Sequence, residues 1–501
     1  NRIERLDEAP RAYRDLLSTE CMRSVLEAAR IRDVDRALPL LSAVYSVLEP
    51  RLDSPARRQG FLRIHYSLSR EFQSAPDPFL GLANLHKVVA SLASEPWAAQ
   101  ALLDQPRLAR LLFRLIGRSE PMLQTLQRWP HLVRLLSYEA LRSAGQAEPP
   151  ECPSADDLRR WQKTALFLAE AREMIMGEGL PWSYAVHTAV ADAVCAGVFL
   201  RACSETEGRE GLPRGALSDN ACLLGLGRLG FREMHPRSDL DLVCVKRGAW
   251  ILPGDPDRSA LVEAKFARAL VEAFTAVTRH GSLYDLDFRL RPYGGSGPQM
   301  QSPGALEEYF RGPARPWERL SYLKGRPVAG ASGLGQEALA AVWAEARRTG
   351  LPAGELPGLL ELRQKLEAGA RDLDGILKFA PGGLLHLDLL LLALQVRSGL
   401  DPGDEGTLGL IRRLGGAGAL PPDLCEALHR SRLFQDTLLH RCRLHFERAP
   451  LRGKRAGAWR EVGRLWQASP QGGKEAPPPD QIQALWNDHR QAVLSAWDQL
   501  L

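Results

Sequence analysis

The chain has 501 residues, of which 45% are hydrophobic and 25% are charged, and its formal net charge is +5. This composition is ordinary for a globular protein of about two to four domains. The charge is too small for the length to indicate a nucleic-acid groove or a membrane surface. The longest apolar runs, such as residues 384–396, are shorter than the about 18 residues of a membrane span. We therefore expect neither a membrane nor nucleic acid as a partner.

Eight cysteines are scattered through the chain without a Cys-x-x-Cys pair, so neither a zinc site nor a disulfide framework is indicated. Cys222 and Cys244 lie in apolar stretches that are typical of core strands. Buried free thiols indicate a reducing compartment, and we expect a cytoplasmic protein. The first residues are charged, lack the apolar stretch of a signal peptide and do not begin with Met, as in a fragment or a processed chain.

Residues 1–150 are predicted to form an N-terminal helical domain, in which residues 108–116 have helical apolar spacing. Prolines predict a linker at 146–155. Residues 157–330 follow as a second domain that begins with two leading helices within 157–205, one over 157–176 and one from about Trp182. The second helix carries one apolar stripe, formed by Val186, Val190, Val194 and Val198.

The segment 215–330 is the α/β core of this second domain, because apolar and polar residues alternate in it. Short strands are predicted at 222–226, 239–245 and 282–290, and the helix before the last strand spaces Val262, Phe266, Leu270 and Phe274 four apart. Residues 355–450 are predicted to be a C-terminal helical bundle, with helices at 384–396, 408–414 and 422–446. Residues 451–501 are predicted to hold a linker at 469–479 and a terminal helix at 481–501. The predicted fold class is α+β, a mostly helical chain in which helical bundles flank one small mixed-sheet domain.

A glycine-rich turn precedes the second predicted strand. Residues 225–230, Gly-Leu-Gly-Arg-Leu-Gly, match the Gly-x-Gly-x-x-Gly pattern of dinucleotide-binding folds. In those folds the turn opens a full helix and the ribose-binding acid lies about 20 residues later. Here eight residues separate Gly230 from Asp239, which leaves room for a turn or two and excludes a crossover helix.

Three aspartates in the same region indicate a metal site. Side chains two apart on a strand point to the same face, so Asp239 and Asp241 project together. Such close carboxylates repel each other unless a cation lies between them. If the strand with Asp287 is a neighbour, three carboxylates converge as ligands suited to Mg²⁺, beside a glycine-rich turn whose N–H groups can approach a phosphate.

A glycine-rich turn, an Asp-x-Asp strand and a third Asp on a later strand resemble the DNA polymerase beta nucleotidyltransferase superfamily. Within it, two longer segments resemble the glutamine synthetase adenylyltransferase family: residues 225–242, Gly-Leu-Gly-Arg-Leu-Gly-Phe-Arg-Glu-Met-His-Pro-Arg-Ser-Asp-Leu-Asp-Leu, and residues 284–292, Tyr-Asp-Leu-Asp-Phe-Arg-Leu-Arg-Pro. Further matching positions follow in order at Ser296-Gly-Pro, Trp317-Glu-Arg, Lys324, Arg326, Lys378, Gly382-Gly383 and Gln395. The resemblance covers residues 80–450 approximately and is strongest over 220–330.

The resemblance implies a function and a set of site residues. The family moves AMP to or from a tyrosine of glutamine synthetase, with ATP as AMP donor, and so regulates nitrogen assimilation. It implies two Mg²⁺ ions, glutamine synthetase as protein substrate and a nitrogen-signalling regulatory protein as a further partner. The family protein usually carries two catalytic halves; this chain has one, whose Ser296-Gly-Pro and Trp317-Glu-Arg look more like the AMP-removing half. The implied metal ligands are Asp239, Asp241 and Asp287, and the implied nucleotide- or phosphate-binding residues are Gly227, Arg228, Gly230, Ser238, Arg289 and Arg291.

The sequence also departs from the family pattern. Phe231 stands where the family has a second Gly, Arg228 replaces Lys, and residues 384–389 replace Ile-Arg-Asp-Ile-Glu-Phe. A catalytically weak or inactive nucleotide-binding regulator or scaffold is therefore an alternative, as is a nucleotidyltransferase with another acceptor, although the charge argues against RNA. We expect Phe231 to point outward, under the sheet, and Trp317 to be a core residue rather than a base-stacking platform.

Overall fold

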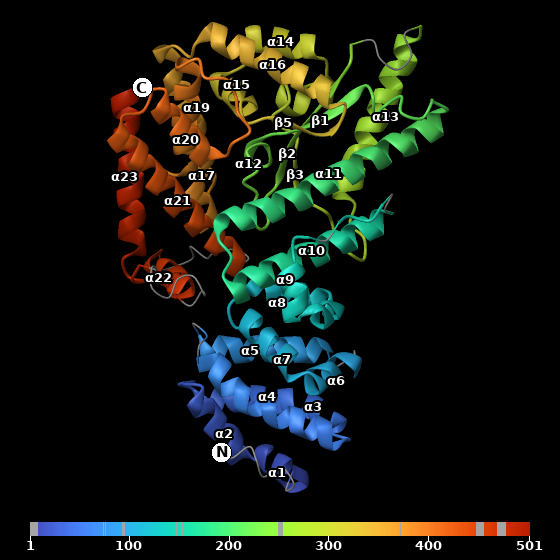
Figure 1. The fold of residues 1–501 in the computed structure, drawn as a ribbon, viewed down its shortest axis with the longest axis vertical. Helices are drawn as coiled ribbons and strands as arrows, with labels where there is room; N and C mark the ends of the chain where they lie inside the picture. The colour runs from blue at the N-terminus through green and yellow to red at the C-terminus, as the bar shows by residue number, and fades with distance from the viewer. Residues whose placement is uncertain are drawn as a thin grey trace.

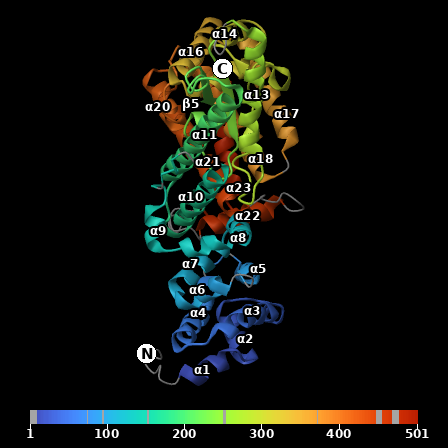
Figure 2. The same ribbon diagram turned by 90° about the vertical axis from the view of Figure 1, so that its right-hand side faces the viewer.

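The protein is an elongated, mostly helical molecule with a small β-sheet at the end opposite the N-terminus (Figures 1 and 2). The computed structural model describes residues 9–73, 75, 77–92, 96–146, 148–151, 154–248, 254–370, 372–446, 455–467 and 477–501. The predicted linker at 469–479 lies outside the described residues up to position 476. Short 3₁₀ turns occur at η2 (Glu49–Arg51), η3 (Pro130–Leu135), η4 (Gly294–Ser296) and η5 (Ala353–Glu355).

The N-terminal region is helical, as its apolar spacing predicts. Its helices are α1 (Ala9–Leu16), α2 (Thr19–Ala28), α3 (Val34–Leu48), α4 (Pro55–Gln73), α5 (Pro78–Leu92), α6 (Pro96–Asp104), α7 (Pro106–Ile116), α8 (Glu120–Arg128) and α9 (Tyr138–Ser143). Side chains of Ser18, Asp33, Ser119 and Ser137 accept backbone hydrogen bonds at the first turns of α2, α3, α8 and α9. One apolar cluster joins these helices, and it includes Leu444 from far along the chain.

Two long helices lead from this region to the sheet. They are α10 (Ala155–Met176), capped by Ser154, and α11 (Leu180–Glu210), which ends at Gly211 in the left-handed conformation, with φ +64°. The predicted valine stripe of α11 is buried. Figure 1 shows α11 and α13 (Pro256–Thr275) along one side of the sheet.

Among the described residues the sheet has five strands: β1 (Ala221–Gly225), β2 (Leu240–Lys246), β3 (Leu286–Asp287), β4 (Met300–Gln301) and β5 (Arg326–Gly330). The order is β3-β2-β1-β5, and β4 also pairs with β2. β1 runs antiparallel to β2 and β5, whereas β3 and β4 run parallel to β2. The β1–β2 connection contains only the four-residue helix α12 (Gly227–Gly230), so a dinucleotide-binding crossover is absent between these two fully described strands.

The sequence prediction was wrong about the length of the third strand and did not find β4 or β5. Only Leu286 and Asp287 of the predicted strand 282–290 pair with β2. After Asp287 the backbone turns back, because the N–H of Arg289 donates to the Asp287 carboxylate and that of Arg291 to the Phe288 carbonyl. β4 is two residues long, too short for an alternating pattern, and Pro327 interrupts the pattern of β5.

The two faces of the sheet are covered by different helices. Leu223 and Leu242 pack into a cluster with α11 and α13, while Leu224 and Val243 pack with α14 (Pro303–Arg311) and α16 (Ser332–Thr349). Because side chains alternate along β2, Asp241 projects on the same side as Val243. The strand thus begins with carboxylates and continues with buried apolar residues on one face.

The C-terminal helices lie beside the sheet rather than behind it (Figure 1). They are α15 (Pro316–Tyr322), α17 (Leu356–Gly369), α18 (Leu373–Phe379), α19 (Leu384–Arg397), α20 (Thr407–Gly416), α21 (Pro422–His445), α22 (Arg455–Gln467) and α23 (Ile482–Leu500). The four helices predicted after residue 380 are confirmed within one or two residues at most ends.

Two stretches of the described chain, Leu180–Glu210 and Leu373–Arg397, are long and apolar enough to cross a membrane by length and composition. The sequence analysis did not find these two stretches, because it considered only uninterrupted runs of apolar residues. The most apolar parts of these two stretches are 61% and 78% buried inside the fold. Core helices of soluble proteins can be equally long and apolar.

Candidate functional site

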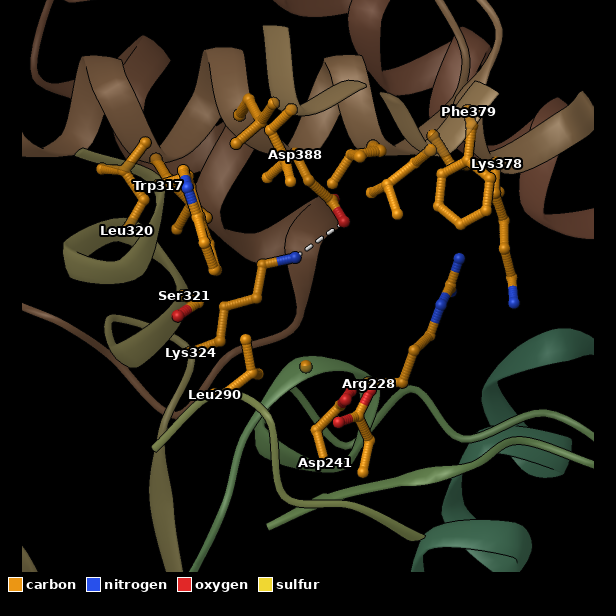
Figure 3. A pocket seen from close by; sticks show the side chains of 18 of the residues that line it. Arg228, Asp241, Leu290, Trp317, Leu320, Ser321, Lys324, Lys378, Phe379 and Asp388 are labelled. Atoms are coloured by element: carbon orange, nitrogen blue, oxygen red, sulfur yellow. Dashed lines mark ion pairs between the residues drawn. The ribbon is translucent and has the colours of Figure 1, made fainter. Parts of the chain in front are cut away.

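Asp241 and Asp287 are partners in the sheet. They stand opposite each other in the parallel pairing of β2 and β3, so their side chains leave the sheet on the same side. Asp239, two residues before Asp241, is the exposed member of the set. The three aspartates line one cavity of about 470 Å³, which is also lined by residues of α15, α17, α18, α19 and α21 (Figure 3).

The electrostatics of this cavity centre on Asp241. Burial, and then the charges of Asp239 and Asp287, raise the pKa of Asp241 to about 7. Asp287 behaves differently: burial alone would raise its pKa, but hydrogen bonds from Arg289 outweigh burial and hold the pKa below its ordinary value. The Arg289 Nη2 atom lies 2.5 Å from Asp287 Oδ2, and its Nε lies 2.9 Å from Oδ1.

The glycine-rich turn is built against Asp241. Gly227 has φ +52°, and a Cβ there would lie 2.1 Å from Asp241 Oδ2. The N–H of Leu226 donates to the Asp241 carbonyl at 2.8 Å, which fixes the start of the turn on β2. Gly230 serves packing instead, because a Cβ at this position would lie 1.8 Å from the Lys324 carbonyl oxygen. Gly227 lines the cavity and Gly230 does not.

The arginines and the serine predicted to contact phosphates fall into two groups. Arg228 and Arg289 line the cavity. Ser238 and Arg291 do not: Ser238 is buried and accepts a hydrogen bond from Arg443 Nη1 at 2.9 Å. Arg291 donates to carbonyls of its own loop, at 3.3 Å to Gly295 and 3.4 Å to Phe288. Ser238 and Arg291 are therefore engaged by other protein groups and do not line the cavity.

A buried ionic network joins the turn to the C-terminal helices. Arg432 of α21 is 1% exposed in its side chain, and its guanidinium lies 2.6 Å from Glu233, 2.6 Å from Asp388 and 2.5 Å from Asp436. Two other cationic side chains that line the cavity pair with the same carboxylates. Lys324 lies 2.7 Å from Asp388, and Arg228 lies 2.8 Å from Asp436.

This network keeps the buried Asp436 ionised. Burial opposes ionisation of Asp436, but Arg228 and Arg432 hold its pKa well below the ordinary value. In formal charge, the three cations Arg228, Lys324 and Arg432 equal the three carboxylates of Glu233, Asp388 and Asp436.

Sequence reasoning did not find this network, or the apolar residues of α17 to α19 that line the cavity. The available signals were an acid, Asp388, inside the apolar run 384–396, and the four-residue spacing of Arg432 and Asp436 on α21. Neither signal identifies Glu233 as a partner of Arg432, because the two residues lie about 200 positions apart in the sequence.

Phe231 does not line the cavity. Its side chain is 7% exposed, is absent from the cavity lining and packs in the C-terminal core cluster with Leu320 and Leu323. Its ring is thus buried in a core, as the outward prediction requires, but that core is formed with helices rather than under the sheet. Trp317 packs against the same cluster and also lines the cavity, so it is both a core residue and a cavity residue.

The donors suit a hard divalent cation, because carboxylate oxygens are the ligands that Mg²⁺ prefers. Gly227 lies close against the Asp241 carboxylate, and the neighbouring charges of Asp239 and Asp287 help to raise the pKa of Asp241. Both observations fit a cation between the carboxylates. Within the described residues, however, no group of three Asp, Glu, His or Cys side chains is already arranged as a ligand set. Asp287 would have to leave Arg289 to complete one.

Comparisons with known proteins identify a family model and relatives that this chain matches. Residues 92–341 match the family model described as Glutamate-ammonia ligase adenylyltransferase. A protein of Burkholderia mallei is 29% identical over 323 residues, which are 60% of this chain and 35% of the relative. One of Stenotrophomonas maltophilia is 30% identical over 352 residues, 67% of this chain and 37% of the relative. One of Pseudomonas aeruginosa is 28% identical over 356 residues, 67% of this chain and 36% of the relative.

All three relatives carry the name bifunctional glutamine synthetase adenylyltransferase/adenylyl-removing enzyme. The matched part of the chain spans 35% to 37% of their lengths. The matched segment 92–341 contains the whole sheet, the glycine-rich turn and the three aspartates. Through these residues the chain belongs to the glutamate-ammonia ligase adenylyltransferase family.

Proposed function

We propose that this chain is a cytoplasmic nucleotidyltransferase that moves AMP to or from a tyrosine of glutamine synthetase. The observation that carries the proposal is the pairing of Asp241 with Asp287 across β2 and β3, above a glycine that must lack a side chain. An antiparallel β1–β2 pair joined by a short turn, with the acids at the start of β2, supports a polymerase beta-like catalytic domain.

In this proposal Asp239, Asp241 and Asp287 hold two Mg²⁺ ions. When bound, these ions would offset the charge of the reacting phosphate and orient the two oxygens that exchange on it. The chain's own residues do the rest. Gly227 leaves room for the Asp241 carboxylate against the turn, Arg228 is held at the cavity by Asp436, and Arg289 is placed to exchange Asp287 for a phosphate oxygen.

ATP is the proposed AMP donor for the forward reaction. The relatives' printed name covers both attachment and removal of the adenylyl group, and this chain matches about a third of their length, so both directions need a test. Glutamine synthetase is the proposed protein substrate, and a nitrogen-signalling regulatory protein is a proposed further partner.

The test uses the whole chain with Mg²⁺ and glutamine synthetase from the same organism. In the forward assay, ATP labelled in its adenylyl group should transfer label to the synthetase. In the reverse assay, adenylylated synthetase and phosphate should release ADP. Asp241→Asn serves as the control in both assays, and label transfer or release that this variant leaves undiminished would reject the site.

The second candidate is a nucleotide-binding regulator with little or no activity. It is favoured by the bidentate contact of Arg289 with Asp287, which leaves no preassembled ligand set among the described residues. A chain that binds ATP with Mg²⁺ but yields no label transfer or ADP release in either assay would be this regulator.

A further inference from the structure

A chain of three buried ionisable side chains leads from Arg228 into the protein, and none of the three lines the cavity. Nη1 of Arg228 lies 2.8 Å from Nε2 of His235, in the loop between α12 and β2. Nδ1 of His235 lies 3.1 Å from Nδ1 of His440 on α21. Nε2 of His440 contacts the carboxylate of Glu173 on α10. Each of the three residues is 1% exposed, so solvent does not replace these contacts.

The hydrogen bonds of this chain can run in only one direction. A guanidinium donates and never accepts, so Nε2 of His235 must accept from Arg228. The proton of His235 is then on Nδ1, which donates to Nδ1 of His440. His440 in turn carries its proton on Nε2 and donates it to Glu173. Both rings are therefore neutral, and in each ring one nitrogen donates and the other accepts.

The surroundings favour these charge states. Burial, and then the charge of Arg228, hold the pKa of His235 well below its ordinary value, which keeps this ring neutral. Burial opposes ionisation of Glu173, but its contacts with His440 and its other neighbours outweigh burial and hold its pKa below the ordinary value. Asp436 lies 3.6 Å from Nε2 of His235, which is too far for a hydrogen bond, so Asp436 does not compete with Arg228 for that nitrogen.

Two partners fix the plane of the Arg228 guanidinium. Oδ1 of Asp436 also lies 2.8 Å from Nη1 of Arg228, so the two N–H bonds of this nitrogen are directed at Asp436 and His235. A single partner would let the guanidinium pivot, whereas two partners at one nitrogen of a planar group hold it in one orientation. Arg228 lines the cavity, and Figure 3 shows its side chain extending from the turn toward the helices on the opposite side.

We infer that this chain of side chains is a positioning relay, which holds Arg228 in one orientation for the reaction at the cavity. The relay consists of Glu173, His440 and His235. The inference rests on the proposed function, since the cavity is proposed to hold the reacting phosphate. The relay makes the orientation of a cavity side chain depend on α10, a helix that contributes no residue to the cavity lining.

The first test locates the protons in the wild type without ligand. Nitrogen NMR spectra of isotope-labelled histidine distinguish the two neutral tautomers from the charged ring, and His235→Gln and His440→Gln assign the signals. We expect the proton of His235 on Nδ1 and that of His440 on Nε2. A proton on Nε2 of His235, or a charged His235 ring, would overturn the inference. This measurement needs neither activity nor a variant that folds poorly.

The second test compares two substitutions of Glu173. Glu173→Met removes the acceptor at the end of the relay, whereas Glu173→Gln keeps one, because its amide oxygen can accept from His440. His65→Leu is the control, since His65 is a buried histidine of α4 that pairs with Tyr45 at 2.7 Å, among the N-terminal helices. Glu173→Met should lower kcat by about tenfold or more in whichever of the two assays the wild type supports, as expected for a misplaced catalytic group. Glu173→Gln and His65→Leu should stay within about threefold of the wild type.

A double-mutant cycle separates positioning from a purely structural role. In an Arg228→Gln background Glu173→Met should have little further effect on kcat, because the side chain that the relay positions is gone. Additive losses in that background, or an equal loss of kcat in His65→Leu, would overturn the inference. Wrong tautomers in an active wild type would reject the relay alone. Correct tautomers in a wild type that transfers AMP in neither direction would reject the proposed function, and with it the role of the relay in the reaction.

Discussion

A methyl group on the Cα of Gly227 would stand 2.1 Å from Oδ2 of Asp241, so the two residues fit together only because position 227 has no side chain. Gly227→Ala should therefore displace the Asp241 carboxylate and abolish Mg²⁺-dependent ATP binding. The left-handed φ of +52° adds a backbone cost of about 1–2 kcal/mol for a non-glycine residue.

The matched control for Gly227→Ala is Gly211→Ala. Gly211 also has a left-handed φ, +64°, but a Cβ there meets nothing within 4 Å. The control should show the backbone cost in urea unfolding and keep ATP binding. Equal loss of binding in both variants would mean that the contact with Asp241 does not matter.

The raised pKa of Asp241, about 7, predicts how stability depends on pH without metal. Between about pH 4 and pH 7 the unfolded chain ionises this group while the folded chain keeps its proton, so the free energy of unfolding falls as the pH rises. Asp241→Asn removes this contribution, and its melting temperature should fall less over this window than that of the wild type. Mg²⁺ should stabilise the wild type more at pH 8 than at pH 5, and Asp241→Asn little at either. Parallel melting curves for the two proteins would contradict the prediction.

Arg289 competes with cations for Asp287, because it holds both carboxylate oxygens. Arg289→Gln should raise the affinity for Mg²⁺ alone by a few-fold, since the competing charge is lost, and should weaken Mg²⁺-dependent ATP binding, since a phosphate partner is lost. Arg268→Gln is the control, because Arg268 makes an exposed pair with Glu272 on α13. Titration calorimetry with Mg²⁺ and with ATP measures both effects, and weaker binding of Mg²⁺ alone would be the wrong sign.

Phe231 is a buried core side chain under Lys324, whose Nζ lies 4.9 Å from the ring centroid. Phe231→Gly should lower the free energy of unfolding by about 3–5 kcal/mol, the usual cost of deleting a buried phenylalanine. ATP affinity should not rise. Phe231→Leu keeps most of the apolar volume and should lose much less stability. Tighter ATP binding by Phe231→Gly without a loss of stability would show that the ring obstructs the phosphates.

Arg432 pairs with three buried carboxylates, those of Glu233, Asp388 and Asp436. Asp388 and Asp436 each have a second cation, Lys324 and Arg228, so the loss of Arg432 affects Glu233 most. Arg432→Met should therefore destabilise the protein by about 3–5 kcal/mol, as expected when one partner of a buried ionic network is removed. Arg430→Met is the control on the same helix, because Arg430 pairs with Glu426 in the solvent, where such a pair contributes about 0–1 kcal/mol. Denaturant unfolding of the two variants measures the difference, and similar midpoints would contradict the assigned role of Arg432.

The features that the sequence predicts well, strand β2 and the turn before it, depend on residues that are close together in the sequence. The alternation from Asp239 to Val245 predicts β2, and the eight residues after Gly230 exclude a crossover helix, because both follow from backbone geometry alone. The pairing of Asp241 with Asp287 was a condition of the metal hypothesis, and the register of β2 and β3 meets it. The roles of Ser238 and Arg291 depend on which neighbour each side chain contacts. Ser238 accepts a hydrogen bond from Arg443, and Arg291 donates one to the Gly295 carbonyl. The contact of Ser238 with Arg443 forms only when α21 packs beside the turn, and the contact of Arg291 with Gly295 depends on a loop conformation that residue alternation does not predict.

The contact between Arg432 and Glu233 also limits how this protein can be divided. The family match ends at residue 341, but a fragment cut there would keep Glu233 and Arg228 and lose Arg432, Asp436 and the helices that cover Phe231. The segment that matches the family model therefore shares its buried ion pairs and its apolar core with helices that follow it in the chain. A fragment that is to keep these contacts has to extend through α21.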